Sequence, residues 1–263
     1  MKKNILIDKV RSITSEVLRQ PAVQRLLQRY PKLISFVVAR FDPNYFIGLP
    51  LTLVLLAGAV NVALLSNLTE SVVESEWIVT VDKHFTEMLF SVRTEWLSQV
   101  LYTISWLGDR LAVFIVGALA SLLLLLRRRW VGLVAFWLVM GGVGLVVQYG
   151  KKIISRNRPG ADFAYYVVDH FSFPSGHATT AMALYGMLAY LLYRHLNVAW
   201  QRQLLVWAAL LFILLVGFSR IYLGVHYLSD VLAGYLLGVL WLLVGASIVE
   251  VAQYHRARER ERR

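Results

Sequence analysis

The residues best suited to chemistry stand in three short polar stretches between long apolar segments. The stretches are KKIISRNRP at 151–159, PSGH at 174–177 and SRIYLGVHYLSD at 219–230. Each contains a cation or a histidine beside residues that can hold an anion. Guanidinium and ammonium groups bind phosphate oxygens, and an imidazole exchanges protons near neutral pH. Phosphate chemistry is therefore the first hypothesis.

The first stretch offers two phosphate ligands, Lys151 and Arg158. They stand seven positions apart, about two helical turns, so both project from one face if a helix continues to Pro159. The planar fork of arginine and the compact charge of lysine together suit a phosphate. For this stretch alone, the alternative is two basic side chains reaching for the membrane interface.

The second stretch combines a turn with a histidine. Gly176 lets the backbone present amide N–H groups to an anion at a helix start, and Ser175 adds a hydroxyl donor. His177 ionises in the range needed to protonate a leaving oxygen. A helix cap beside an incidental histidine is the alternative.

The third stretch contains His226 and Asp230, four positions apart and so on one face of a helix. An aspartate bonded to one imidazole nitrogen fixes the tautomer and leaves the other nitrogen free to attack. Metal binding is the rival interpretation, but the sequence shows no closely spaced carboxylate cluster beside this pair. Arg220, with Lys151 and Arg158, would supply the positive charge instead, so we predict no metal and no cofactor.

The composition predicts an all-α polytopic membrane protein that carries these stretches on six transmembrane helices. Of 263 residues, 58% are hydrophobic and only 16% are charged, and the mean hydropathy is +0.58. The chain has no cysteine, so it has no disulfide framework. The predicted spans are 46–65, 111–126, 130–150, 178–193, 204–218 and 231–251.

The spans define one membrane domain at 46–251, with a cytoplasmic amphipathic segment at 1–45 before it and a basic cytoplasmic tail at 252–263 after it. Residues 96–107 are expected to form a helix at the outer interface or an extension of the second span. The remainder of 66–110 is expected to be an acidic outer loop without chemistry. The apolar positions of the amphipathic segment are Val23, Leu26, Leu27 and Tyr30.

The basic residues predict the orientation of the chain. Nineteen of the 27 Lys and Arg residues fall in the termini or in connections that six spans place on one side. By the positive-inside rule that side is cytoplasmic, so both termini are inside and the three polar stretches face outward. The net charge of +11 is thus explained by topology, and no nucleic-acid partner is expected.

The three stretches resemble the signature of the type 2 phosphatidic acid phosphatase superfamily. The matching elements are Lys151-x6-Arg158-Pro159, Pro174-Ser175-Gly176-His177 and Ser219-Arg220-x5-His226-x3-Asp230, and every signature position is present. The resemblance covers about 46–251. Members of this superfamily include bacterial lipid phosphatases, glucose-6-phosphatase and vanadium haloperoxidases.

The resemblance implies a role for each signature residue without a metal. His226 would be the nucleophile that forms a phosphohistidine, Asp230 would orient it, and His177 would protonate the leaving group and then activate water. The implied phosphate ligands are Lys151, Arg158, Ser175, Gly176 and Arg220.

The sequence thus predicts a lipid phosphatase of the inner (plasma) membrane whose partner is a membrane lipid. Undecaprenyl diphosphate, phosphatidylglycerophosphate and phosphatidic acid are the substrates expected first. A lipid A phosphatase or phosphotransferase is the alternative within the same chemistry. An anion transporter would need polar or broken helices at mid-membrane, and a haloperoxidase has no need of six apolar spans.

Overall fold

The computed structural model describes residues 29, 30, 32, 36, 40, 41, 46–75 and 77–261. Contacts divide the chain into two units, Met1–Leu53 and Val54–Arg263. In the first unit, Nη1 of Arg40 donates to the carbonyl oxygen of Ile47 at 2.8 Å. The amphipathic helix predicted around Val23, Leu26 and Leu27 lies outside the described residues.

Every regular element among the described residues is helical, which confirms the all-α prediction. Helices suit lipid because their backbone polar groups bond within the segment. The helices are α4 (Leu49–Val73), α5 (Trp77–Ser91), α6 (Glu95–Trp106), α7 (Arg110–Leu126), α8 (Trp130–Ile154), the short 3₁₀ turn η1 (Ala161–Phe163), α9 (Gly176–Tyr193), α10 (Ala199–Tyr222) and α11 (Leu228–Glu261).

Among the described helices, α4, α8, α10 and α11 are each long and apolar enough to cross a membrane. A fifth crossing is possible where α6 and α7 follow each other with a bend of 44°. The six predicted spans correspond to α4 and α7–α11, but α9 does not meet the same standard of length and hydropathy. Six is therefore an approximate number of spans.

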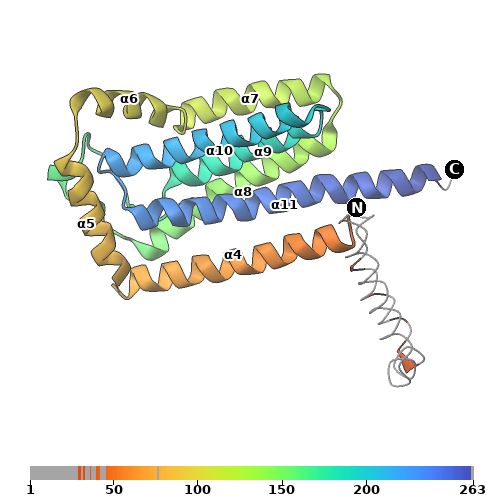
Figure 1. Cartoon of the computed structure of the whole chain (residues 1–263), viewed down its shortest axis with the longest axis horizontal. Coiled ribbons are helices and arrows are strands. Elements are labelled where there is room, and N and C mark those ends of the chain that lie inside the picture. The colour runs from red at the N-terminus through yellow and green to blue at the C-terminus, as the bar shows by residue number, and fades with distance from the viewer. Residues whose placement is uncertain are drawn as a thin grey trace, which may run out of the picture. The chain divides into compact units, whose positions relative to one another are not determined.

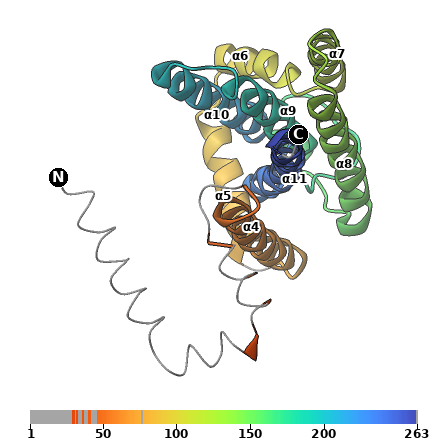
Figure 2. The same ribbon diagram turned by 90° about the vertical axis from the view of Figure 1, so that its right-hand side faces the viewer.

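The position of α9 explains why it is less apolar than its neighbours. It packs against α8, α10 and α11 (Figure 2), and Ala178, Ala181 and Leu184 on it are fully buried. A helix enclosed by other helices needs small residues for close packing more than it needs lipid-facing apolar ones.

A small-residue motif on α11 allows the close approach to α9. A Cβ on Gly234 would lie 2.7 Å from the carbonyl oxygen of Ser175, and one on Gly238 would lie 2.5 Å from Cβ of Met182. These two glycines, four positions apart, form the G-x-x-x-G pattern of close helix packing in membranes. The contact fixes the start of α9 beside the first turns of α11.

The segment at 66–110 is mostly helical, so the expected loop is wrong outside 96–107, where the expected helix is present as α6. α5 packs against α10, α11 and η1, and α6 packs against α10. Figure 1 shows α5 crossing the end of the bundle where α10 ends and α11 begins. On α5, Ile78, Asp82 and Leu89 are buried. This helix therefore places a carboxylate at the end of the bundle where the polar stretches lie.

Candidate active site

The three polar stretches meet where α8 and α10 end and α9 and α11 begin. Backbone hydrogen bonds hold the connecting segments together there. The N–H of Tyr165 donates to the carbonyl of Leu223 at 2.9 Å, and that of Ser175 donates to the carbonyl of Asp230 at 2.9 Å. The predicted convergence of 151–159, 174–177 and 219–230 is thus present in the structure.

Lys151 and Arg158 come together, although not by the helical route expected. α8 ends at Ile154, and Ser155 after it has a left-handed backbone with φ of 48°. Arg158 therefore lies beyond the helix. Its Nη2 nevertheless donates at 3.4 Å to the carbonyl oxygen of Phe171, which also accepts a hydrogen bond from Nζ of Lys151.

His226 is buried between an aspartate and an arginine. Its Nδ1 is 3.3 Å from Oδ2 of Asp230, and its Nε2 is 3.2 Å from Nη1 of Arg158. α11 begins at Leu228, so His226 precedes the helix and the expectation that both residues share a helix face is wrong. The backbone N–H of Tyr227 instead holds Oδ2 of Asp230 at 2.9 Å. The pairing assigns the proton to Nδ1 and leaves Nε2 with a lone pair.

The surroundings of His226 keep its imidazole neutral. Burial lowers its pKa well below the usual range, and the positive charges of Arg158, Arg220 and Lys151 lower it further. Burial, followed by the charge of Arg220, also lowers the pKa of Arg158, but a guanidinium stays protonated in proteins. The site therefore places a neutral imidazole among fixed cations.

Arg220 and Ser175 each present a buried donor at this site. Arg220 is 2% exposed, and its Nη1 donates to Oγ of Ser105 and to the hydroxyl of Tyr166. Among the described residues, Nε of Arg220 and Oγ of Ser175 have no hydrogen-bond partner. Ser175 is fully buried, and its side chain makes no cap bond to α9, which argues against the cap interpretation. Unpaired buried donors are costly, so both suit an oxygen-rich anion.

Gly176 and His177 open α9 on the same side. A Cβ added to Gly176 would lie 3.4 Å from Cγ1 of Val147, an ordinary contact. The ring of His177 is close to the α6–α7 bend, because its Cδ2 lies 3.1 Å from a Cβ built on Gly108. His177 also interacts electrostatically with the cations Arg220, Arg158 and Lys151 and with His226. All eight predicted site residues thus lie at this end of the bundle.

The sequence reasoning missed Asp82, Arg156 and Ser229. The two terminal nitrogens of Arg156 each form an ion pair with a different buried carboxylate. Nη2 is 2.7 Å from Oδ2 of Asp82, and Nη1 is 2.8 Å from Oδ1 of Asp230. The N–H of Ser229 donates to Oδ1 of Asp82 at 2.9 Å. Burial lowers the pKa of Arg156, but the charge of Asp230 and the bonds to Asp82 outweigh it and raise the pKa.

A signal for Asp82 was present in the sequence. It stands four positions after Ile78 and seven before Leu89, both buried on α5. Helical periodicity therefore places the carboxylate on the inward face of that helix. Arg156 had a weaker signal, since it stands between Lys151 and Arg158 without belonging to the pattern they form.

Comparisons with known proteins show which family this chain resembles. The family model "PAP2 superfamily" matches residues 132–254, a range that contains all three polar stretches. Phosphatidylglycerophosphatase B of Bacillus subtilis (strain 168) is 35% identical over 166 residues, which cover 62% of this chain and 80% of that protein. Lipid A 1-phosphatase of Rhizobium johnstonii is 32% identical over 128 residues, 45% of this chain and 48% of that protein.

Two solved structures share the fold. One is described as the crystal structure of the first transmembrane PAP2 type phosphatidylglycerolphosphate phosphatase from Bacillus subtilis. It has a TM-score of 0.63 and 31% identity, covering 72% of this chain and 93% of that one. The crystal structure of Aquifex aeolicus LpxE has a TM-score of 0.50 and 20% identity, covering 63% of this chain and 94% of that one, a similarity of fold alone.

Proposed function

This chain belongs to the PAP2 superfamily, and we propose that it removes phosphate from a lipid phosphate or diphosphate through a phosphohistidine. One observation carries the proposal. Nδ1 of His226 faces Asp230, while Nε2, the nitrogen left free to attack, is 3.2 Å from a guanidinium nitrogen of Arg158. A nucleophile beside a phosphate ligand is the arrangement that phosphoryl transfer needs.

In the first step, the Nε2 lone pair of His226 attacks phosphorus. The N–P bond forms as the P–O bond to the lipid breaks, and protonated His177 gives its proton to the departing lipid oxygen. The phosphate ligands stabilise the charge on the oxygens that do not react. These ligands are Lys151, Arg158, Arg220, the hydroxyl of Ser175 and the amide of Gly176.

In the second step, His177 acts as a base. It takes a proton from water, whose oxygen attacks phosphorus as the N–P bond breaks. Inorganic phosphate leaves, and His226 returns to its neutral form. Asp230 keeps Nδ1 protonated throughout, so the ring presents the same nitrogen in both steps.

Phosphatidylglycerophosphate is the substrate that we place first, because the relative with 35% identity and the structure with 31% identity are both named for that activity. Undecaprenyl diphosphate and phosphatidic acid carry the same reactive group. A lipid A phosphate is the second candidate, supported by the lipid A 1-phosphatase of Rhizobium johnstonii and by the lipid A 4'-phosphatase of Porphyromonas gingivalis, which is 27% identical over 202 residues.

The reaction is proposed for the outer face of an inner (plasma) membrane with both termini in the cytoplasm. The distribution of basic residues supports this orientation. The basic α7–α8 turn, Arg127–Arg129, and the end of α9 at Arg194 lie at the opposite ends of the helices that carry the candidate site. The phosphate would stay in water while the lipid chains remain in the bilayer.

The experiment that tests the proposal combines a substrate panel with trapping of the covalent intermediate. Purified protein in detergent is given each candidate lipid, and released inorganic phosphate is measured. Quenching the reaction with labelled substrate in alkaline detergent should yield an acid-labile, base-stable phosphoenzyme in the wild type and none in His226→Ala. Phosphate release without a trace of label on the wild-type protein at any quench time would contradict the phosphohistidine.

Metal independence is tested in the same assay. Lys151, Arg158 and Arg220 supply the positive charge that a metal would otherwise provide, so phosphate release should continue at full rate in excess EDTA. Vanadate should inhibit, because it resembles the transferring phosphoryl group. Loss of activity in EDTA with recovery on adding Mg²⁺ would refute this part of the proposal.

A further inference from the structure

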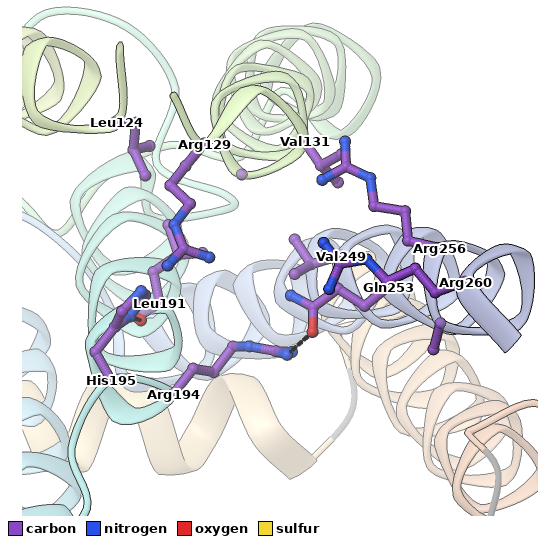
Figure 3. A pocket seen from close by; sticks show the side chains of 12 residues that line it. Leu124, Arg129, Val131, Leu191, Arg194, His195, Val249, Gln253, Arg256 and Arg260 are labelled. Carbon is purple, nitrogen blue, oxygen red and sulfur yellow. Dashed lines mark hydrogen bonds between the residues drawn. The ribbon is translucent and has the colours of Figure 1, made fainter. Parts of the chain in front are cut away.

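A second polar feature lies at the opposite end of the same helices. A cavity of about 440 Å³ opens there between the α7–α8 turn, the end of α9 and the last turns of α11 (Figure 3). His177 and Arg194, near the two ends of α9, are seventeen positions apart, about 26 Å along the helix. The cavity is therefore distinct from the candidate active site.

The cavity is strongly basic. Arg194 is balanced by Glu250 and also donates to Gln253. Within the part of the chain that the structure describes, the side chains of Arg129, Arg256 and Arg260 form no hydrogen bond or ion pair, and no carboxylate lines the cavity. The basic lining residues are Arg129, Arg194, His195, Arg256 and Arg260.

The arginines that line the cavity come from three separate elements: the α7–α8 turn, the end of α9 and the last turns of α11. On α11, Gln253, Arg256 and Arg260 are spaced by three and four positions and so share a helix face. Figure 3 shows the side chains of Arg129, Arg194 and Arg256 reaching toward the opening from different directions. Arginines that converge on one cavity bind a compact anion better than arginines spread over a flat surface do.

Part of the cavity lining is apolar and is called the apolar wall below. It consists of Leu124, Val131, Leu191 and Val249. Leu124 belongs to the LLLLL run that ends α7, where Leu126 is 73% exposed. Leu124 thus stands two positions before a side chain exposed on the surface that lipid chains would cover. A ligand that fits both walls has an anionic part joined to a hydrocarbon part.

We propose that this cavity binds the phosphate headgroup of an anionic phospholipid from the leaflet at this end of the bundle. Arg129, Arg256 and Arg260 would contact the phosphate, and the acyl chains would follow the apolar wall. Basic pockets between membrane helices on the cytoplasmic side are suited to such headgroups. A free phosphate would use the cations but leave the apolar wall without a partner.

Native mass spectrometry of the full chain in detergent tests the proposal. Phosphatidylglycerol and phosphatidylcholine, matched in acyl chains, are titrated into the wild type and into Arg129→Gln/Arg256→Gln. The variant should bind phosphatidylglycerol about 10- to 30-fold more weakly, as expected for two lost arginines at a lipid surface. Binding of phosphatidylcholine should not change.

The matched control is Arg127→Gln/Arg258→Gln, which removes one arginine from the same turn and one from the same helix without touching the cavity. It should stay within about twofold of the wild type, and any lipid held at the other end of the bundle contributes equally to both variants. Equal losses in the two variants, or equal binding of the two lipids by the wild type, would overturn the proposal. Displacement of the lipid by excess inorganic phosphate would show a phosphate site and also overturn it.

A second inference concerns Asp82 and Arg156, and it rests on the proposed function. Arg156 occupies Oδ1 of Asp230, so Oδ2 is left for His226 and for the N–H of Tyr227. The carboxylate of Asp82 in turn accepts hydrogen bonds from Nη2 of Arg156 and from the backbone N–H and the hydroxyl of Ser229. Both aspartates are fully buried, so this geometry has little freedom to relax.

We propose that Asp82 is a positioning residue that acts through Arg156 to hold the Asp230 carboxylate toward His226. Without the charge of Asp82, Arg156 would pair with Asp230 alone and draw that carboxylate away from the imidazole. Loss of the Asp82 charge should therefore slow the covalent step without moving the phosphate ligands. Buried ionic networks of this kind are sensitive to the loss of one partner.

Asp82→Asn keeps the size of the side chain and removes its charge. Its kcat should fall about 10- to 100-fold, as for other residues that orient a reacting group through a second residue, while KM stays within about twofold. Thr86→Val is the control, because Thr86 is buried one turn further along α5 and, among the described residues, its hydroxyl donates only to the carbonyl of Asp82. It should keep the wild-type kcat.

The outcomes separate this inference from the proposed function. An active wild type with an unchanged kcat in folded Asp82→Asn refutes the positioning role alone, whereas an inactive wild type refutes the function. If Asp82→Asn does not fold, Ser229→Ala loosens the same network with a smaller change. Ser229→Ala should also lower kcat at an unchanged KM. A rise in KM at an unchanged kcat would refute the positioning role of Asp82.

Discussion

His177 and His226 differ in what their replacement should do. His226→Ala removes the nucleophile and should abolish turnover on every substrate. His177→Ala removes a proton donor, and general acid catalysis is typically worth about 10²–10⁴-fold. The loss should be larger on a lipid monoester, whose leaving alkoxide is a strong base, than on a diphosphate, whose leaving group is a phosphate. The ratio of the two kcat values, variant to wild type, measures this difference.

Ser175→Ala provides the control for that comparison. It deletes one donor among several and should lower kcat by about 10- to 100-fold on both substrates alike. Detergent gel filtration must first show that each variant folds. If correctly folded His226→Ala kept more activity than Ser175→Ala, then the nucleophile would be misassigned and His177 would take its place.

The protonation of His226 can be measured directly. Burial and the charges of Arg158, Arg220 and Lys151 lower its pKa below the ordinary value of about 6.5. The imidazole should therefore remain neutral as the pH falls through 6.5 and take up a proton only in more acidic solution. In the unfolded chain it would already be protonated there, so the group costs stability in acid and costs none above about pH 7.

NMR of histidine-labelled protein checks this pKa. The resonance of His226 is the one that disappears in His226→Gln. Its midpoint should lie below the ordinary value of about 6.5. A midpoint at or above 6.5 would contradict the electrostatic environment described for the site.

At the scale of elements, the turn after α10 depends on Gly224. Its φ is +67°, and a Cβ there would lie 1.9 Å from the carbonyl oxygen of Phe163. Gly224→Ala should therefore lower the free energy of unfolding by about 1–3 kcal/mol or more and displace the segment that leads to His226. Thermal unfolding in detergent, with phosphate release beside it, measures both effects.

Gly144→Ala is the matched control, since a Cβ at this position on α8 meets nothing within 4 Å. It should leave stability unchanged or raise it by up to about 1 kcal/mol. If Gly224→Ala were as stable and active as Gly144→Ala, the close approach between the two segments would not hold in solution.

Hydropathy predicted the helices that face lipid but not α5, which brings Asp82 to the site. The apolar runs located α4, α7, α8, α10 and α11, because their composition matches the surrounding solvent. α5 was not predicted, because charged residues interrupt it and its buried face contacts protein, whereas α6 corresponds to the helix predicted at 96–107. α9 was found as an apolar run, but its small residues reveal an enclosed position only once its neighbours are known.

The site residues could be predicted better than the backbone that places them. Residue types at fixed spacing indicated His226, Asp230 and Arg220 without any knowledge of the turns. The left-handed Ser155 that ends α8 carries no glycine or proline to signal it. The pairing of Arg156 with Asp82 joins positions 74 residues apart, and spacing within one stretch holds no information on such a contact.

For the whole molecule, the orientation in the membrane is a prediction that cysteine labelling can test. The chain has no cysteine, so each introduced thiol is unique. Asp162→Cys, on exposed η1 near the candidate site, should react in intact cells with a reagent that cannot cross the membrane. Arg128→Cys, in the α7–α8 turn, should react only after the membrane is opened. The reverse pattern would show that the site faces the cytoplasm.

The ion pairs around Arg156 also have a consequence for the choice of substrate. Apart from the proton that His177 donates, four cations, Lys151, Arg156, Arg158 and Arg220, face two carboxylates, Asp82 and Asp230, a formal excess of two positive charges. A phosphate monoester dianion brings this sum to zero, whereas the phosphodiester of an ordinary bilayer lipid leaves one charge uncompensated in a buried setting. Electroneutrality would thus let the enzyme ignore the diester lipids that surround it in vast excess and retain the rare lipid with a terminal phosphate.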